Sequence, residues 1–513
     1  MQNDRIGHEF TAKKKGRIDM DASLALPTND KKTTAEGATQ VWTCPEFKVS
    51  GAFSSHMVLQ REKPIYVWGF SDTPGSRVAG CFMGETVTAE VNGENRWKLT
   101  FSSHLYTCEP QIMVISDDRG HTVTFEDILI GDVWMIGGQS NAEMTMASCM
   151  ALTPSIEFSE DDNFRLFTQT QAYVYTHQEF CNAPQPDIIN ADWCWKRPDR
   201  EASLAFSAMG WHFAKEVSHH VDVPLGMVMM AAGGACIREL IPEELAHGEG
   251  YFYGANVREA GYYNTLIHPF EGLQFKAMLF FQGESEGGDL TLAQKYDYEL
   301  ALLVTDERTR FGFNFPFYNV QLSDYLEEGT QFFPYHDVIR IKQFDALSII
   351  PDSTLTVDMD LGAPDGHPDW AHSPRKWELG ERLAKLALSK EYSIGRLSEA
   401  GSPRPVAATL SADGKQVTVE FTDVGAGLIV SGHSPADSYG MEVQGFSFGG
   451  YENRILAHAT VATRCAVVVD VPDGADITRV NYAYFLRVLP ETADLRGGNN
   501  LPTPAFSLKV IGA

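Results

Sequence analysis

The feature that most constrains the fold is the alternation of short apolar runs with helical patterns between residues 128 and 395. The apolar runs lack a polar face, which is typical of strands buried on both sides. The predicted strands are ILIGDVWMI, LGMVMMAA, KAMLFFQ, FPFYNVQL and STLTVDMDL. Between them, residues 206–220 and 295–311 carry apolar side chains at helical spacing. Because strands that alternate with helices form parallel sheets, we predict an α/β domain with a parallel sheet flanked by helices over residues 128–395.

The pattern differs on either side of this domain. Short strand signals broken by Gly, Pro, Asn and Asp fill residues 46–127 and return over residues 396–513. Such spacing predicts a β-sandwich-like module at each end. Residues 1–45 are polar and lysine-rich without periodicity, and we predict a flexible tail there.

Charge and composition exclude several classes of function. The chain has 41 Lys and Arg residues against 68 Asp and Glu, a net charge of −27 that repels nucleic acids and anionic membranes. No apolar run reaches the ~18 residues of a membrane helix, and no secretory signal is visible. The eight cysteines form no C-x-x-C pair, so neither a disulfide framework nor a zinc site is predicted. We therefore expect a cytoplasmic location, with the mature form of a secreted protein as the alternative, because such a form would look the same without its leader. We expect no metal and no cofactor.

Polar residues follow the predicted strands where a ligand would bind. In a parallel sheet, ligands bind at the carboxyl ends of the strands. Ser140 follows VWMIGGQ, Gly234 follows MVMMAAG, Gln282 follows MLFF, and Asp369 and His372 follow TVDMDL. These residues supply a hydroxyl, a backbone amide, a side-chain amide, and an acid with a base.

This set of groups is the one that acyl transfer requires. A hydroxyl attacks, a base takes its proton, an acid orients the base, and N–H donors stabilise the oxyanion. The glycines before Ser140 allow a tight strand-to-helix turn that presents the hydroxyl and the free N–H groups of the helix. Each feature alone has an ordinary structural explanation, such as a turn, a helix cap or a surface loop, but their joint occurrence after successive strands favours a catalytic site.

Several motifs in order resemble the sialate O-acetylesterase family, a branch of the SGNH hydrolases. The sequence GQSNAEM is similar to the family's GQSNM block, and MVLQREKPIYVWGF to its amino-terminal β signature. Further resemblances are YYNTLIHPFEGLQFKAMLFFQGESEG, HSPRKWELGERLAKLAL and NNLPTPAF. The resemblance implies an SGNH-hydrolase-like fold and a serine esterase that removes O-acetyl groups from carbohydrates.

The resemblance also implies roles for individual residues. Ser140 would be the nucleophile, His372 its general base, and Asp369 the acid that orients His372. The oxyanion donors would be the Ser140 N–H, the Gly234 N–H and the side chain of Gln282.

A second histidine competes for the role of base. His367 and Asp365 lie in DGHP, which also resembles a D-x-H-P pattern. We favour His372 because Lys376 and Gly380 follow it at the family spacings of four and eight residues.

Three further residues are predicted to bind the substrate, namely Asn141, Glu284 and Arg238. Arg238 stands at a position where an acid is common in the family. The positive charge of the arginine would suit a carboxylate such as that of sialic acid. The alternative is a helix-surface ion pair. We predict O-acetylated sialic acid as the substrate. The alternatives are acetylated plant manno- or xylo-oligosaccharides and, outside the enzymes, a carbohydrate-binding protein without catalysis. The oligomeric state is not predicted.

Overall fold

A central, mostly parallel sheet carries the structure. The computed structural model describes residues 43–151, 153–160, 162–246, 257–324, 333–362, 372–489 and 491–512. Six strands run parallel in the order β9-β11-β8-β12-β13-β14, and β10 pairs antiparallel with β9 at one edge. The strands are β8 (Thr122–Gly138), β9 (Phe164–Thr168), β10 (Trp195–Lys196), β11 (Leu225–Met229), β12 (Ala277–Phe281), β13 (Phe317–Gln321) and β14 (Ser353–Val357). The predicted α/β fold with a helix-flanked parallel sheet is confirmed.

The sheet differs from the prediction at one edge. Strand β9 was not expected from the sequence, and β10 makes the sheet mixed. The five residues of β9 include Arg165, whose guanidinium donates to the carbonyl of Phe164 at 2.9 Å. The charge interrupts the apolar pattern by which the other parallel strands were identified.

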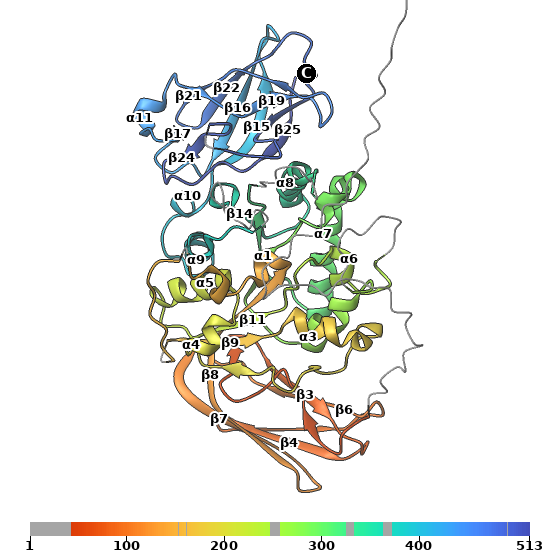
Figure 1. Ribbon diagram of the computed structural model, residues 1–513. Coiled ribbons are helices and arrows are strands. Elements are labelled where there is room, and N and C mark those ends of the chain that lie inside the picture. The colour runs from red at the N-terminus through yellow and green to blue at the C-terminus, as the bar shows by residue number, and fades with distance from the viewer. Residues whose placement is uncertain are drawn as a thin grey trace, which may run out of the picture. The chain divides into compact units, whose positions relative to one another are not determined.

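Helices cover both faces of the central sheet (Figure 1). Helices α5 (Ala208–Ser218) and α9 (Lys376–Glu391) pack together on one side, and α7 (Leu290–Phe311) packs with α8 (His336–Asp345) and α6 (Ile237–Leu240) on the other. The shorter helices are α1 (Ser140–Glu143), α2 (Met146–Cys149), α3 (Gln171–Thr176), α4 (Arg200–Leu204), α10 (Leu397–Ala400) and α11 (Pro435–Ser438). The short turns are η1 (Gln178–Asn182), η2 (Tyr263–Ile267), η3 (His268–Phe270), η4 (Glu286–Gly288), η5 (Ala346–Ser348) and η6 (Met359–Leu361).

Local signals set the ends of the longest helix, α7. The side chain of Asp289 accepts hydrogen bonds from the N–H groups of Thr291 and Leu292, which would otherwise have no intrahelical partner. Gly312 ends the helix with φ of 83°, a left-handed conformation that glycine adopts without steric cost.

The amino-terminal strands form two groups, since three of them make a separate sheet and the other four are continuous with the central sheet. They are β1 (Lys48–Val49), β2 (Val58–Gln60), β3 (Ile65–Phe70), β4 (Arg77–Phe82), β5 (Glu85–Glu90), β6 (Arg96–Phe101) and β7 (Thr107–Asp117). Strand β8 pairs with β7 over its first part and joins the parallel sheet over its last part. The domain boundary predicted between residues 127 and 128 falls inside β8, and the division into domains stays a prediction.

The carboxyl-terminal strands form three sheets, with the orders β15-β16-β22-β21-β18, β17-β24 and β20-β19-β23-β25. Their bounds are β15 (Arg404–Leu410), β16 (Gln416–Thr422), β17 (Leu428–Val430), β18 (Glu442–Val443), β19 (Phe446–Phe448), β20 (Ile455–Leu456), β21 (Ala459–Thr463), β22 (Ala466–Asp470), β23 (Arg479–Tyr482), β24 (Leu495–Gly497) and β25 (Phe506–Lys509). The side chain of Gln321, at the end of β13, both donates to and accepts from the backbone of Ala505, at 2.9 and 2.8 Å. These hydrogen bonds attach the carboxyl-terminal strands to the edge of the central sheet where the polar residues were predicted.

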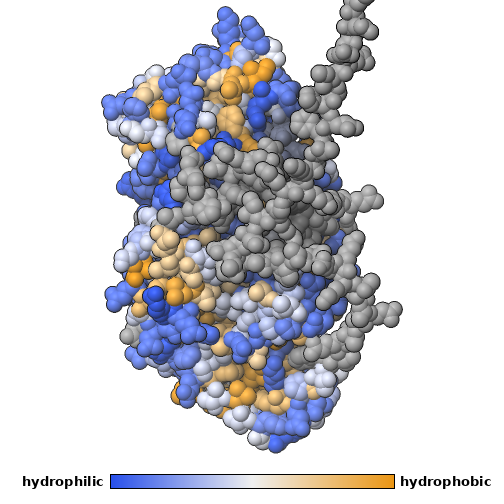
Figure 2. All heavy atoms as spheres, in the orientation of Figure 1, coloured by the Kyte–Doolittle hydropathy of each residue, from blue (hydrophilic) through white to orange (hydrophobic). Residues whose placement is uncertain are grey.

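The core of the central sheet is aromatic as well as aliphatic. Trp134 in β8 is fully buried, and its ring contacts Phe213 of α5 and Tyr318 of β13 edge-on, at centroid distances of 4.6 and 5.6 Å. On the visible face, hydrophilic residues surround several separate apolar patches (Figure 2). Among the helices of the described residues, we find none that combines the length and the apolar character of a membrane span.

Candidate active site

The turn after β8 requires glycine at its last strand position. Gly138 has φ of 125°, and a Cβ atom there would lie 2.1 Å from the carbonyl oxygen of Phe281 on the neighbouring strand β12. The N–H of Gln139 donates to the same carbonyl at 3.0 Å, and helix α1 begins at Ser140. The close approach of the two strands therefore explains the glycine that precedes the GQSN motif, and the turn leaves Ser140 partly exposed at the carboxyl edge of the sheet.

The structure brings two of the predicted catalytic residues into contact. The Nε2 atom of His372 lies 2.7 Å from Oγ of Ser140, although 232 positions separate the two residues in the chain. An imidazole at this distance can take the hydroxyl proton as the hydroxyl attacks. The predicted Asp369 and the competing pair His367 and Asp365 lie outside the described residues.

A buried polar network links the neighbours of Ser140 and His372. Oδ1 of Asn141 accepts hydrogen bonds from Nζ of Lys376 at 2.6 Å and from the N–H of Ser373 at 3.3 Å. Nδ2 of Asn141 donates to Oε1 of Glu284 at 2.5 Å. The network therefore joins helix α1, the segment after β12 and the start of α9, the three elements that surround the Ser140–His372 contact.

This network bears on two residues that were predicted to bind substrate. Asn141 and Glu284 are only 1% and 3% exposed, and each has a protein partner. Burial raises the pKa of Glu284, although the hydrogen bond from Asn141 and the charges of His372 and Lys376 oppose the shift. Their contact with the substrate stays a prediction, while the structure gives both side chains a structural role.

The side chain of Gln282 is held from several directions. Its Nε2 atom lies 3.1 Å from Oε1 of Gln139, 3.0 Å from the carbonyl of Ala235 and 2.5 Å from a carboxylate oxygen of Glu286. Its Oε1 atom accepts from the hydroxyl of Tyr296 at 2.8 Å. An amide nitrogen carries two hydrogens, so these contacts already occupy the donor that was predicted to face the oxyanion. That role of Gln282 stays a prediction.

Two backbone N–H groups are open near the serine. Within the described part of the chain, neither the N–H of Ser140 nor that of Gly234 donates to a protein acceptor. The turns that carry them are adjacent, because the N–H of Ala232 donates to the carbonyl of Gly138 at 3.0 Å. Unpaired N–H groups beside a reactive hydroxyl can stabilise an oxyanion.

Glu143, which was not predicted as a site residue, holds the second of these turns. Its carboxylate accepts from the N–H of Gly233 at 2.7 Å and from the N–H of Gln171 at 3.2 Å. Burial raises the pKa of Glu143 to about 7, although both hydrogen bonds and the charge of His372 favour ionisation. The sequence signal was an acid three residues after Ser140, within one helical turn of it.

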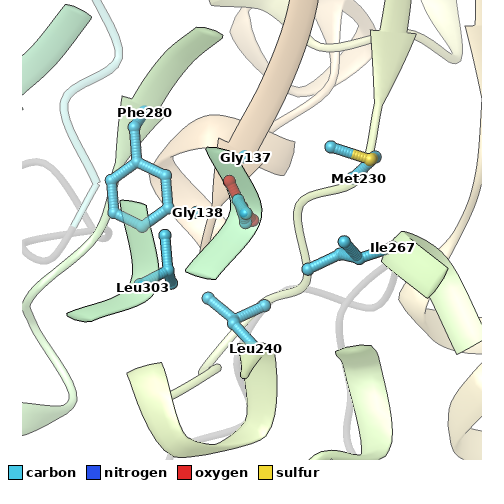
Figure 3. Close-up of a pocket in the computed structure, with 8 residues that line it drawn as sticks. Gly137, Gly138, Met230, Leu240, Ile267, Phe280 and Leu303 are labelled. Atoms are coloured by element: carbon cyan, nitrogen blue, oxygen red, sulfur yellow. The ribbon is translucent and has the colours of Figure 1, made fainter. Parts of the chain in front are cut away.

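A small apolar cavity lies behind the serine turn. Figure 3 shows side chains from several elements directed at the backbone of Gly137 and Gly138. The labelled side chains belong to Met230, Leu240, Ile267, Phe280 and Leu303. Glu307 of α7 also lines the cavity, and burial raises its pKa to about 8. The cavity is too small and too apolar to hold a sugar.

The comparisons with known proteins identify the family of the chain. A family profile described as carbohydrate esterase, sialic acid-specific acetylesterase, matches residues 130–389, just over half of the chain. The chain belongs to this family. It is thus a carboxylic ester hydrolase with an acetylated carbohydrate as its substrate.

Individual relatives of this esterase have low sequence identity to it but match over most of its length. The sialate O-acetylesterase of Mus musculus is 23% identical over 420 residues, which cover 69% of this chain and 75% of the relative. The sialate O-acetylesterase of Homo sapiens is 25% identical over 396 residues, with coverages of 69% and 73%. The crystal structure of a carbohydrate acetylesterase from Xanthomonas citri is 26% identical, with a TM-score of 0.73 over 90% of this chain and 99% of that one.

Arg238 of the esterase lies in an ion pair. Its guanidinium is 3.7 Å from the carboxylate of Glu299 on α7, and the residue is 5% exposed. Burial raises the pKa of Glu299, while Arg238 favours its ionised form. The ion pair is thus present, although between two helices rather than on a surface, and binding of a substrate carboxylate by Arg238 stays a prediction.

Metal ligands are not grouped in the described part of the esterase. The described residues contain no group of three or more His, Cys, Asp or Glu side chains that could hold a metal ion. The eight cysteines all lie among these residues, and none of them is in a disulfide bond.

Proposed function

We propose that the esterase removes O-acetyl groups from sugars through an acyl-enzyme formed on Ser140. The observation that carries this proposal is the 2.7 Å distance between Oγ of Ser140 and Nε2 of His372. As Oγ attacks the acetyl carbonyl, His372 takes the hydroxyl proton and then gives it to the departing sugar oxygen. Water that loses a proton to the same imidazole then attacks the acetyl-serine. As the bond between the acetyl carbon and Oγ breaks, the imidazole returns the proton to Oγ of Ser140, and acetate leaves.

The negative charge that develops on the carbonyl oxygen needs donors. The open N–H groups of Ser140 and Gly234 support a role in this stabilisation, and Ser140 adds the partial positive charge of a helix start. Gln282 would have to exchange one of its present partners to join them. Asp369 remains the proposed orienting acid of His372 on the sequence resemblance.

For the sugar, we propose O-acetylated sialic acid, which the names of the mouse and human relatives suggest. One observation favours a second candidate, a neutral acetylated oligosaccharide of manno or xylo type. Arg238 is the arginine proposed for a sialate carboxylate, and its charge is already engaged by Glu299. The net charge of −27 would also oppose the approach of an anionic sugar.

Acetate release tests the mechanism and the substrate together. Wild type and Ser140→Ala are compared on O-acetylated sialic acid and on acetylated manno- and xylo-oligosaccharides. We expect release by the wild type and a loss of at least about 1000-fold in Ser140→Ala, since the nucleophile is removed. Ser148→Ala, at an exposed serine of α2, is the matched control and should keep full activity.

The outcomes separate the two claims. Undiminished activity of Ser140→Ala would overturn the serine mechanism. Serine-dependent release only from the neutral oligosaccharides would keep the mechanism and replace sialic acid by the second candidate.

A further inference from the structure

The turn that carries Gly234 is held by side chains from three separate elements. It follows strand β11, and Gly234 itself has φ of 69°, in the left-handed region that favours glycine. Such a turn has little intrinsic rigidity, because glycine has access to more backbone conformations than any other residue. Its precise orientation must therefore come from contacts with the surrounding protein.

One of these contacts determines the direction of the Gly234 N–H. Nε2 of Gln171 donates to the carbonyl oxygen of Gly233 at 2.6 Å. That carbonyl and the Gly234 N–H belong to the same peptide group, which is planar and trans, so the N–H points opposite to the C=O. By holding the oxygen, Gln171 thus directs the N–H on the other side of the peptide plane.

The two adjacent peptide groups are held as well. The carboxylate of Glu143 accepts the N–H of Gly233 at 2.7 Å, which holds the preceding group. Oγ of Ser285 donates to the carbonyl of Gly234 at 3.0 Å, which holds the following group. Three consecutive peptide planes are therefore each fixed by a different side chain.

We call Gln171, Glu143 and Ser285 the clamp. The clamp packs closely against the turn and leaves little free space beside it. A Cβ atom on Gly233 would lie 2.9 Å from Oε1 of Gln171 and 3.1 Å from Oε2 of Glu143. Gln171 is itself fixed, because its N–H donates to Glu143 at 3.2 Å and its Nε2 also donates to the hydroxyl of Tyr262 at 3.0 Å. The clamp is therefore a connected unit rather than three independent contacts.

We propose that Gln171 is a positioning residue for the esterase reaction, which directs the Gly234 N–H at the oxyanion through its hydrogen bond to the Gly233 carbonyl. The inference rests on the proposed function, since it assumes an oxyanion formed at Ser140. Gln171 acts through the backbone and does not need to contact the substrate.

The decisive variant is Gln171→Met, which keeps the length of the side chain and removes its donor. Loss of one oxyanion donor costs roughly 100- to 1000-fold in kcat, and a donor that is only misdirected should cost less. We expect kcat for p-nitrophenyl acetate to fall about 10- to 100-fold, with KM changed by less than about twofold. Gln185→Met is the matched control, because Gln185 also donates to backbone carbonyls, those of Phe180 and Ala183, and should leave kcat unchanged.

Two further readouts separate positioning from a general structural effect. Phenylboronic acid forms a tetrahedral adduct with a reactive serine, so its inhibition constant in Gln171→Met should rise by about the same factor as kcat falls. The pH profile of kcat/KM should keep the shape of the wild type, because the contact between Ser140 and His372 is untouched. Should Gln171→Met fail to fold, Ser285→Ala removes another part of the clamp and should lower kcat about 2- to 10-fold.

Failure of this inference is distinguishable from failure of the proposed function. If Ser140→Ala is inactive and Gln171→Met has the kcat and boronate affinity of the wild type, Gln171 is not a positioning residue and the serine mechanism stands. If Ser140→Ala is active, the proposed function itself fails. A rise in KM that accounts for the whole loss would also overturn the inference, since it would indicate a defect in substrate binding.

Discussion

At the scale of single residues, the site depends on a glycine, Gly138, at a position where no side chain fits. Gly138 combines a positive φ with a backbone oxygen 2.1 Å from the position of a Cβ atom. The obstacle is the carbonyl of Phe281 in a central strand, which cannot rotate away as a flexible side chain would. Substitution would have to separate β8 from β12 at the point where Ser140 is presented.

We therefore expect Gly138→Ala to lower the free energy of unfolding by about 3 kcal/mol or more and to reduce kcat at least about 10-fold. Urea unfolding and acetate release measure the two effects. Gly84→Ala is the control, because Gly84 has φ of 80° but open space around its Cβ position, and it should cost only about 1 kcal/mol. Equal effects of the two variants would show that the close approach of the strands is unimportant.

At the scale of elements, the turn before the segment 363–371 is tied to the helix that follows His372. Asp360, in the turn η6 before this segment, accepts from Arg382 of α9 at 2.7 and 3.0 Å. It also accepts from Arg496 of β24 at 3.0 Å. Burial opposes ionisation of Asp360, yet these hydrogen bonds hold its pKa below the ordinary value. The hydrogen bonds of Asp360 thus link the carboxyl-terminal strands to helix α9, which begins four residues after His372.

Arg496→Gln should weaken this anchor while Arg382 still pairs with Asp360. We expect a loss of about 1 to 3 kcal/mol in unfolding free energy, because a hydrogen bond to a buried carboxylate is lost. We also expect a fall in kcat of a few-fold, as His372 becomes less well placed. Arg404→Gln, at an exposed arginine of β15, is the control for removal of a positive charge. If both variants behave like the wild type in kcat, the carboxyl-terminal strands do not influence the site.

At the scale of the whole molecule, burial raises the pKa of several acids into the neutral range. It raises the pKa of Glu143 and Asp358 to about 7 and that of Glu286 and Glu307 to about 8. In the unfolded chain such carboxyls ionise near pH 4. Through these four carboxyls, the folded state binds more protons than the unfolded state between about pH 4 and pH 8. Their contribution to the free energy of unfolding therefore falls as the pH rises through this range.

Stability should accordingly decrease between about pH 7 and pH 8.5, a window in which unfolded histidines are mostly neutral and add little. Thermal unfolding at several pH values measures the slope of Tm. Glu307→Gln should reduce that slope, because Oε2 of Glu307 has no hydrogen-bond partner in the described structure and its ionised form is uncompensated. Glu420→Gln, at an exposed residue of β16, controls for the change in net charge. A Tm that rises with pH, or equal slopes in all three proteins, would contradict this account.

Much of the fold could be predicted from local pattern. Runs of apolar residues predicted five of the six parallel strands, and helical periodicity predicted α5 and α7, because burial on one or two faces leaves a regular trace in the sequence. Strand β9 was missed because it is short and carries Arg165. The glycines before Ser140 also indicated a tight turn from local pattern, since a positive φ such as that of Gly138 favours glycine.

The contacts within the site could not be predicted, because they join atoms of residues that lie far apart in the chain. Three examples are contacts between residues that follow different strands. They are the ion pair of Arg238 with Glu299, the hydrogen bonds that occupy the amide of Gln282, and the clamp on the Gly233 peptide. No periodicity or spacing encodes such hydrogen bonds, because each requires two elements to pack at one distance and angle. The sequence thus specified the kinds of groups at the carboxyl edge of the sheet. Packing determined which of these groups bind each other and which N–H groups have no protein acceptor among the described residues.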